Sequence, residues 1–173
     1  MLCLGVFIFK NFYKESIFKM DSDSIPLIIA IGVLVLFSAY FSASETAFTS
    51  INRIRLKNMA QVGNKKANLV LKMAENYNTL LTTLLIGNNI VNIAISTLAT
   101  VLFINMLNGD TTKASTLSTI AVTIVVLIFG EITPKSIAKD SPEKFAMFSA
   151  PLLRVFTYIF YPLNIIFSGW KKL

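Results

Sequence analysis

The sequence contains no histidine and a single cysteine, Cys3, among its 173 residues. The absence of histidine excludes imidazole acid–base chemistry and sites in which histidine binds zinc or copper. One cysteine cannot form an internal disulfide bond or hold a cysteine metal cluster. A metal site in this chain must therefore be built from oxygen ligands.

Charged residues are missing from long stretches of the chain. Residues 24–51 contain only Glu45, and residues 76–109 and 114–130 contain none, while 54% of all residues are hydrophobic. A helix needs roughly 20 mostly apolar residues to cross a bilayer. The sequence therefore predicts an all-α, multi-pass membrane protein. Its three transmembrane helices are expected at about 25–51, 79–107 and 114–138.

Positive charges gather in two segments outside these spans. Residues 52–75 carry six Lys or Arg against one acid, Glu75, and the segment from residue 135 onward carries six more. Because Lys and Arg mark the cytoplasmic side, we expect the N-terminus outside the cell membrane and the C-terminus in the cytoplasm. The net charge of +7 is then explained by topology and contact with the lipid bilayer, and no nucleic-acid partner is expected.

The first two segments outside the spans have different predicted roles. Residues 1–24 are expected to be a poorly ordered N-terminal extension, with Met20 as the more natural start and a signal peptide as the less favoured alternative. Residues 53–75 form a basic amphipathic segment that is interrupted at Gly63 and Asn64. They predict two short juxtamembrane helices at the cytoplasmic face.

The aromatic-rich C-terminal segment, residues 141–172, is expected to form a juxtamembrane belt whose helix begins at Pro142. Aromatic side chains suit the headgroup level of the bilayer. A fourth span over residues 145–170 is the alternative. We favour the belt, because Arg154 would be costly at the centre of the bilayer.

Polar side chains recur at helical spacing within the three spans, so that those of one span share a face. They are Ser38, Ser42, Glu45 and Thr49 on the first span, Asn88, Asn92 and Ser96 on the second, and Thr119, Thr123 and Glu131 on the third. One interpretation is that they join the helices through hydrogen bonds. The other is that they line a functional site, which a carboxylate and two asparagines favour, because a carboxylate in a membrane needs a partner or a water-filled cavity.

The third span ends in GEITPK, residues 130–135. Pro134 has no N–H for the carbonyl four residues earlier, which belongs to Gly130, and Gly130 has no side chain to cover that oxygen. Glu131 adds a carboxylate, which Lys135 is expected to neutralise when no cation is bound. With amide and hydroxyl oxygens nearby, this ligand set suits magnesium, calcium or sodium. The alternative is a simple proline kink with Lys135 extended towards the interface.

Three segments in this order resemble the transmembrane domain of the CorC/cyclin-M (CNNM) family of magnesium transporters: FSASETAFTSINRIRL, LLIGNNIVNIAISTLAT and VVLIFGEITPKSIAK. The resemblance covers about residues 25–165, and it implies that residues 25–173 form one domain of this type. It further implies a homodimer whose protomers each have three transmembrane helices and a juxtamembrane belt. The implied activity is export of magnesium ions from the cytoplasm, with sodium entering in exchange.

The resemblance also implies the binding residues. The family's magnesium ligands fall on Ser42, Asn88, Asn92 and Glu131, with a backbone oxygen near Gly130 as an addition. Secondary candidates are Asn89, Ser44 and Glu45. We expect Glu45 to serve in coupling to sodium or protons.

Family members continue into a paired CBS module that binds ATP, which is expected in the full-length protein and lies outside this sequence. Two other functions remain open at this point. The domain could sense magnesium or regulate another protein without transporting ions, or it could be a membrane-lytic protein, although lysis needs no converging ligands. An enzyme is not expected, because only Glu131 and Lys135 offer acid–base groups.

Overall fold

The computed structural model describes residues 24–162, and every regular element in this part of the chain is helical. The predicted N-terminal extension, residues 1–24, lies outside the described residues except for Ser24. The end of the predicted belt, beyond Pro162, also lies outside them.

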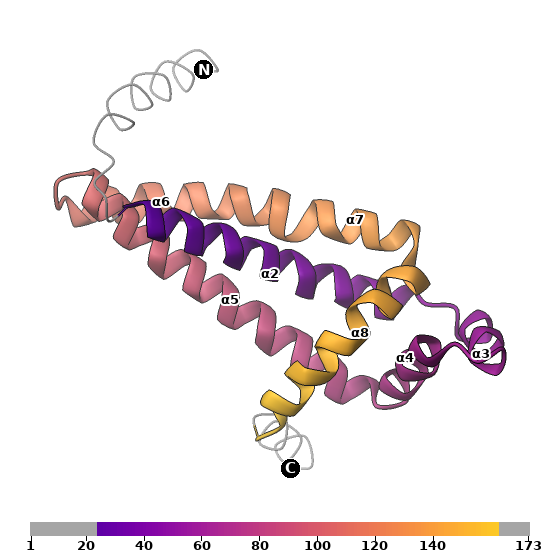
Figure 1. Ribbon diagram of the computed structural model, residues 1–173. Coiled ribbons are helices and arrows are strands. Elements are labelled where there is room, and N and C mark those ends of the chain that lie inside the picture. The colour runs from indigo at the N-terminus through magenta and orange to yellow at the C-terminus, as the bar shows by residue number, and fades with distance from the viewer. Residues whose placement is uncertain (1–23, 163–173) are drawn as a thin grey trace, which may run out of the picture.

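Three long helices form the body of the protein (Figure 1). They are α2 (Ser24–Ser50), α5 (Tyr77–Met106) and a third helix made of α6 (Thr111–Val125), η2 (Val126–Ile132) and α7 (Thr133–Asp140). Each is long and apolar enough to cross a membrane. The prediction of an all-α protein with three transmembrane helices is therefore confirmed.

Two short helices follow α2, as the sequence predicted. They are α3 (Arg53–Gln61) and α4 (Lys65–Glu75). The side chains of Asn52 and Asn64 accept hydrogen bonds from the first N–H groups of α3 and α4, which satisfies donors that have no partner inside the helix. Gly63 separates the helices with φ +94°, a conformation that glycine adopts without steric cost.

The last described helix, α8 (Pro142–Ile159), runs across the long helices rather than alongside them (Figure 1). The Tyr40 hydroxyl of α2 donates a hydrogen bond of 2.7 Å to the Ser149 carbonyl of α8. The rings of Phe41 and Phe156 meet edge to face with centroids 5.0 Å apart. Among the described residues α8 is not one of the three candidate spans, which gives no support to a fourth span.

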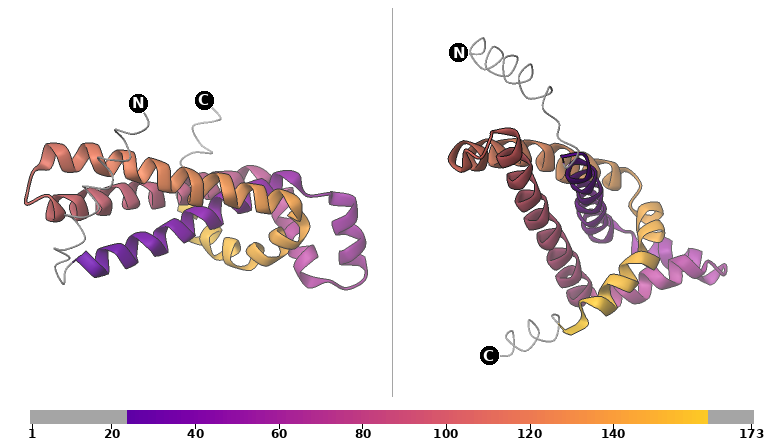
Figure 2. Two further views of the ribbon diagram at one scale, coloured as in Figure 1. Left: turned by 90° about the horizontal axis from the view of Figure 1, so that it is seen from above. Right: turned by 60° about the vertical axis from the view of Figure 1, so that its left-hand side comes forward.

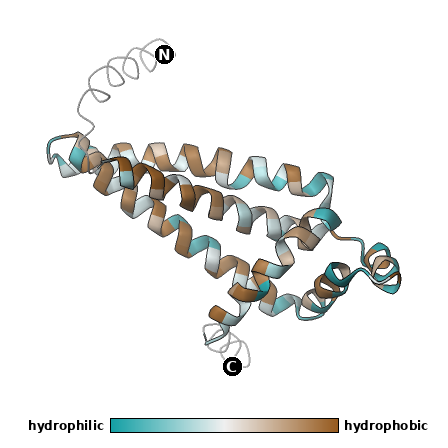
Figure 3. Cartoon of the chain, in the orientation of Figure 1, coloured by the Kyte–Doolittle hydropathy of each residue, from teal (hydrophilic) through white to brown (hydrophobic). Residues whose placement is uncertain are grey.

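The surface separates by polarity along the bundle. Figure 3 shows hydrophilic residues at α3, at α4 and at the turn between α5 and α6, with hydrophobic residues along the long helices. Large apolar side chains such as Leu36, Ile93 and Phe129 are exposed on these helices. An apolar surface of this extent needs a cover, and a bilayer supplies one.

The described parts of both basic segments, residues 52–75 and 135–162, lie at the same end of the bundle. Figure 2 shows the α5–α6 turn at one end and α3, α4 and α8 at the other. At the α5–α6 end, Asp110 caps α6 and forms an ion pair of 2.9 Å with Lys113. The hydrogen bond from Lys113 lowers the pKa of the Asp110 carboxyl below its usual value.

The contact between α2 and α5 is close because Gly87 has no side chain. A Cβ at Gly87 would lie 2.6 Å from the ring of Phe41, which is buried. The ring therefore packs directly against the backbone of α5. This contact sets the position of α5 relative to α2 directly beside Asn88 and little more than one turn before Asn92.

Candidate cation site

Ser38 of α2 is the point at which the three long helices meet. Its hydroxyl lies 2.8 Å from Asn92 Oδ1 and 3.2 Å from Asn88 Oδ1 and donates to these acceptors on α5. On the other side, a Cβ at Gly130 would lie only 3.0 Å from Ser38 Oγ. The structure thus brings Asn88, Asn92 and Gly130, three of the five predicted site residues, together around one serine.

In this cluster one hydroxyl proton, that of Ser38, is shared between two amide oxygens. A serine hydroxyl carries one proton, so Ser38 can satisfy only one of the two amide oxygens fully at a time. A cation near Ser38 would instead attract the lone pairs of both oxygens. The arrangement of the two amide oxygens is therefore suited to a hard cation.

Ser42 lies one helical turn after Ser38 on the same face of α2. It is 1% exposed, and among the described residues its Oγ is the one buried side-chain oxygen or nitrogen without a hydrogen-bond partner. Buried polar atoms are almost always paired, and an unpaired one calls for a specific explanation. A bound ion or its water shell would provide the missing partner.

Glu131 follows Gly130 and is partly buried. We expected Lys135 to neutralise it, and that expectation is wrong. The Lys135 ammonium instead lies 3.6 Å from the carboxylate of Glu45 on α2. The reason is that α7 packs against α2, which puts Lys135 within reach of the carboxylate on that neighbouring helix. Within residues 24–162, Glu131 takes part in no ion pair, so its charge is available to a cation.

The helix around Gly130 is not broken at Pro134. It continues through a π-helical segment, η2, in which the Thr133 N–H bonds the Ile128 carbonyl five residues earlier. Pro134 comes next and has no N–H. In the π-helical register the acceptor for residue 134 is the Phe129 carbonyl, and in the α-helical register of α7 it is the Gly130 carbonyl that the sequence predicted. The segment gives up regular α-helical bonding, as expected, but as a π-bulge, a feature frequent at functional sites.

The secondary candidates are occupied elsewhere or turned away. The Ser44 hydroxyl donates to the Tyr40 carbonyl of its own helix, and Glu45 is paired with Lys135. The side chain of Asn89 is exposed. None of the three joins the cluster at Ser38.

Ser38 itself was not among the predicted ligands, although it lies on the polar face of the first span. Its spacing of four residues from Ser42 was the available signal. Spacing places a residue on a face of its own helix, but it does not show that Ser38 meets both asparagines. That required the packing of α5 against α2.

For the magnesium site that the sequence predicts, replacement of Ser38 by Ala should weaken binding about tenfold, a typical effect of removing a group that orients metal ligands. Without the hydroxyl, the carboxamides of Asn88 and Asn92 lose the group that holds them together. Calorimetric titration of the purified chain would measure this. Ser44→Ala is the matched control, because the Ser44 hydroxyl bonds only its own helix. Equal affinities of the Ser38 variant and the unchanged protein would remove Ser38 from the site.

Comparison with known proteins gives consistent results. The family model for the cyclin M transmembrane N-terminal domain matches residues 28–172. A UPF0053 protein of Haemophilus influenzae is 46% identical over 87% of this chain and 36% of its own length. The UPF0053 inner membrane protein YfjD of Escherichia coli is 44% identical over 73% of this chain and 29% of its own length. A polyamine export protein of Haemophilus influenzae is 28% identical over 79% of this chain and 34% of its own length. The chain thus spans about a third of the length of these relatives.

Proposed function

Because this chain belongs to the family of the cyclin M transmembrane N-terminal domain, we propose that it binds magnesium within the membrane and exports it from the cytoplasm. In this proposal sodium enters in exchange. The chain acts as a homodimer with its N-terminus outside the cell and its C-terminus in the cytoplasm. The basic segments that gather at one end of the bundle support this orientation.

The observation that carries the proposal is the convergence of side-chain oxygens from α2 and α5 beside the backbone of the third helix. Two amide oxygens meet at Ser38, the hydroxyl of Ser42 is buried without a partner, and Gly130 lets the π-helical backbone approach Ser38 closely. Magnesium prefers such oxygen ligands. No group of three or more His, Cys, Asp or Glu side chains occurs in the described residues, so softer metals find no cluster of their usual ligands here.

Movement of the ion is expected to involve the third helix. π-Helical turns are frequent at functional sites, and transporter ion sites are commonly formed by irregular helices. In our proposal, α6 and α7 move relative to each other about η2 and open the cluster at Ser38 to either side of the membrane. The Lys135–Glu45 pair joins α7 to α2 on one side of this hinge.

A second candidate cargo comes from the relative named a polyamine export protein. A polyamine is a long cation with several separated charges and needs carboxylates spaced along its length. Apart from Asp140 at the end of α7, the three long helices carry two carboxylates, Glu45 and Glu131, and Glu45 is already paired with Lys135. The compact oxygen cluster therefore favours a small ion over a polyamine.

Transport should be tested with the purified chain in liposomes that contain no other protein. With magnesium on one side and sodium on the other, we expect magnesium flux that depends on the sodium gradient, and the gradient that supports it gives the direction. Asn92→Ala should reduce this flux about tenfold or more, because it removes an amide ligand. Asn105→Ala, an exposed asparagine near the other end of α5, is the matched control.

The outcomes separate the candidate functions. Magnesium binding without flux would contradict transport and favour a sensor or regulatory domain. Flux of spermidine in preference to magnesium would transfer the proposal to polyamines. Flux that is unchanged in Asn92→Ala would show that ions cross elsewhere.

A further inference from the structure

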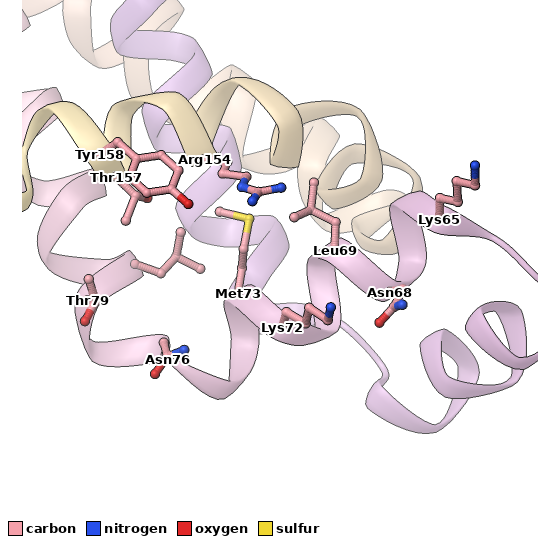
Figure 4. Close-up of a pocket in the computed structure, with 11 residues that line it drawn as sticks. Lys65, Asn68, Leu69, Lys72, Met73, Asn76, Thr79, Arg154, Thr157 and Tyr158 are labelled. Carbon is pink, nitrogen blue, oxygen red and sulfur yellow. The ribbon is translucent and has the colours of Figure 1, made fainter.

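A polar pocket apart from the cluster at Ser38 lies between α4, the start of α5 and the C-terminal half of α8 (Figure 4). Its volume is about 440 Å³. One of the helices that form it, α4, belongs to the basic segment of residues 52–75. None of the residues that line the pocket belongs to the cation cluster at Ser38. Figure 4 shows Arg154 and Tyr158 of α8 facing Leu69 and Met73 of α4 across the pocket.

The charges of this pocket are all positive. Lys65, Lys72 and Arg154 line it, and no Asp or Glu is among its lining residues. The ion pairs formed within residues 24–162 use other cations, so none of these three has a carboxylate partner there. Arg154 makes one contact that preserves its charge, with its guanidinium 5.9 Å from the ring centre of Tyr158. Cations gathered in a concave site without acids attract an anion.

Neutral donors accompany these cations. The amides of Asn68 and Asn76 and the hydroxyl of Tyr158 line the same pocket. Asn76 precedes α5 but makes no capping hydrogen bond with its side chain, which leaves its amide available to a ligand. A guanidinium, ammonium groups and amide N–H donors together match the several strong acceptor oxygens of a phosphate.

We propose that this pocket binds a phosphate group through Arg154 and Lys72, with Lys65 at its edge. The apolar residues Leu69 and Met73 complete the lining and would contact carbon atoms attached to that phosphate. The phosphate belongs either to the headgroup of an anionic phospholipid or to a soluble phosphate compound. The proposal is independent of the magnesium site, since it uses none of the same residues.

The test is calorimetric titration of the full chain, in a neutral detergent, with three probes. Dihexanoyl phosphatidylglycerol carries a net negative charge, dihexanoyl phosphatidylcholine has the same phosphodiester with its charge cancelled, and inorganic phosphate has no lipid part. We expect saturable binding of phosphatidylglycerol or inorganic phosphate, weaker binding of phosphatidylcholine, and weaker binding of all probes at high salt.

Variants place the binding in the pocket. Arg154→Gln and Lys72→Gln should each weaken binding about tenfold, the usual size of one charge-assisted hydrogen bond. Lys66→Gln is the matched control, because it removes the same charge from the same helix outside the pocket. Lys72→Arg should keep the affinity, since it keeps the charge. Both Lys72 and Arg154 are exposed, so these variants should fold normally.

Each outcome either identifies the source of the phosphate or overturns the proposal. Binding of phosphatidylglycerol but not of inorganic phosphate, with loss in Arg154→Gln, assigns the pocket to a lipid headgroup. Binding of inorganic phosphate with the same loss assigns it to a soluble compound. Absence of saturable binding to both probes overturns the proposal. An equal loss in Lys66→Gln overturns it as well, because the effect would then come from overall charge.

Discussion

Replacing Glu131 with Gln should weaken magnesium binding by at least about a hundredfold. At an effective dielectric constant of about 20, two unit charges about 4 Å apart attract each other by roughly 4 kcal/mol, and a divalent ion doubles this term. Glutamine has nearly the same shape but no charge, so the change removes attraction with little effect on packing. Glu131 is in no ion pair within the described residues, so the substitution does not deprive a Lys or Arg side chain of its partner.

The measurement is calorimetric titration of the purified chain with magnesium, with calcium and sodium as competitors. Glu75→Gln is the matched control, because Glu75 is an exposed carboxylate on α4. If both variants bind magnesium as the unchanged protein does, Glu131 is not a ligand. The magnesium that still binds would then be held without the Glu131 carboxylate.

Replacing Gly87 with Ala should destabilise the fold by about 1–3 kcal/mol, the usual cost of excess volume in a packed interior. The new Cβ would lie 2.6 and 2.7 Å from two carbon atoms of the Phe41 ring. That ring is buried and packs edge to face on Phe156, so it has little room to withdraw. A shift of α5 away from α2 would also move Asn88 and Asn92, and magnesium affinity should fall along with stability.

Thermal unfolding of the variants in detergent would measure this effect. Gly32→Ala is the matched control, since Gly32 lies in α2 with nothing within 4 Å of the position of a Cβ. Phe41→Leu combined with Gly87→Ala should recover part of the loss, because the smaller side chain makes room for the methyl group. Equal unfolding temperatures of the Gly87 and Gly32 variants would show that the close contact does not set the distance between α2 and α5.

Much of the architecture could be predicted from local patterns. The uncharged stretches predicted three long helices, and Gly63 and Asn64 predicted the separation of α3 from α4. Pro142 marked the start of α8. These features depend on hydropathy and on backbone preferences of single residues, both of which are readable along the chain.

The partners of polar groups could not be predicted in the same way. Lys135 was expected at Glu131 and lies at Glu45, and Ser38 holds two asparagines that the sequence associated with Ser42 and Glu131. Which groups meet depends on how far each helix is rotated and shifted relative to its neighbours. Contacts such as that of Gly87 with Phe41 decide this, and they join residues far apart in the sequence.

The sequence by itself determined which segments are helical and apolar, where they end, and which polar residues share a face of one helix. Only the tertiary structure decided that Asn88, Asn92 and Gly130 meet at Ser38, that Ser42 Oγ is buried without a partner, and that Pro134 is accommodated by a π-helical segment. The physical reason is that helix formation follows from local backbone and hydropathy preferences. The site follows from close packing between helices, which depends on the shapes of all three at once.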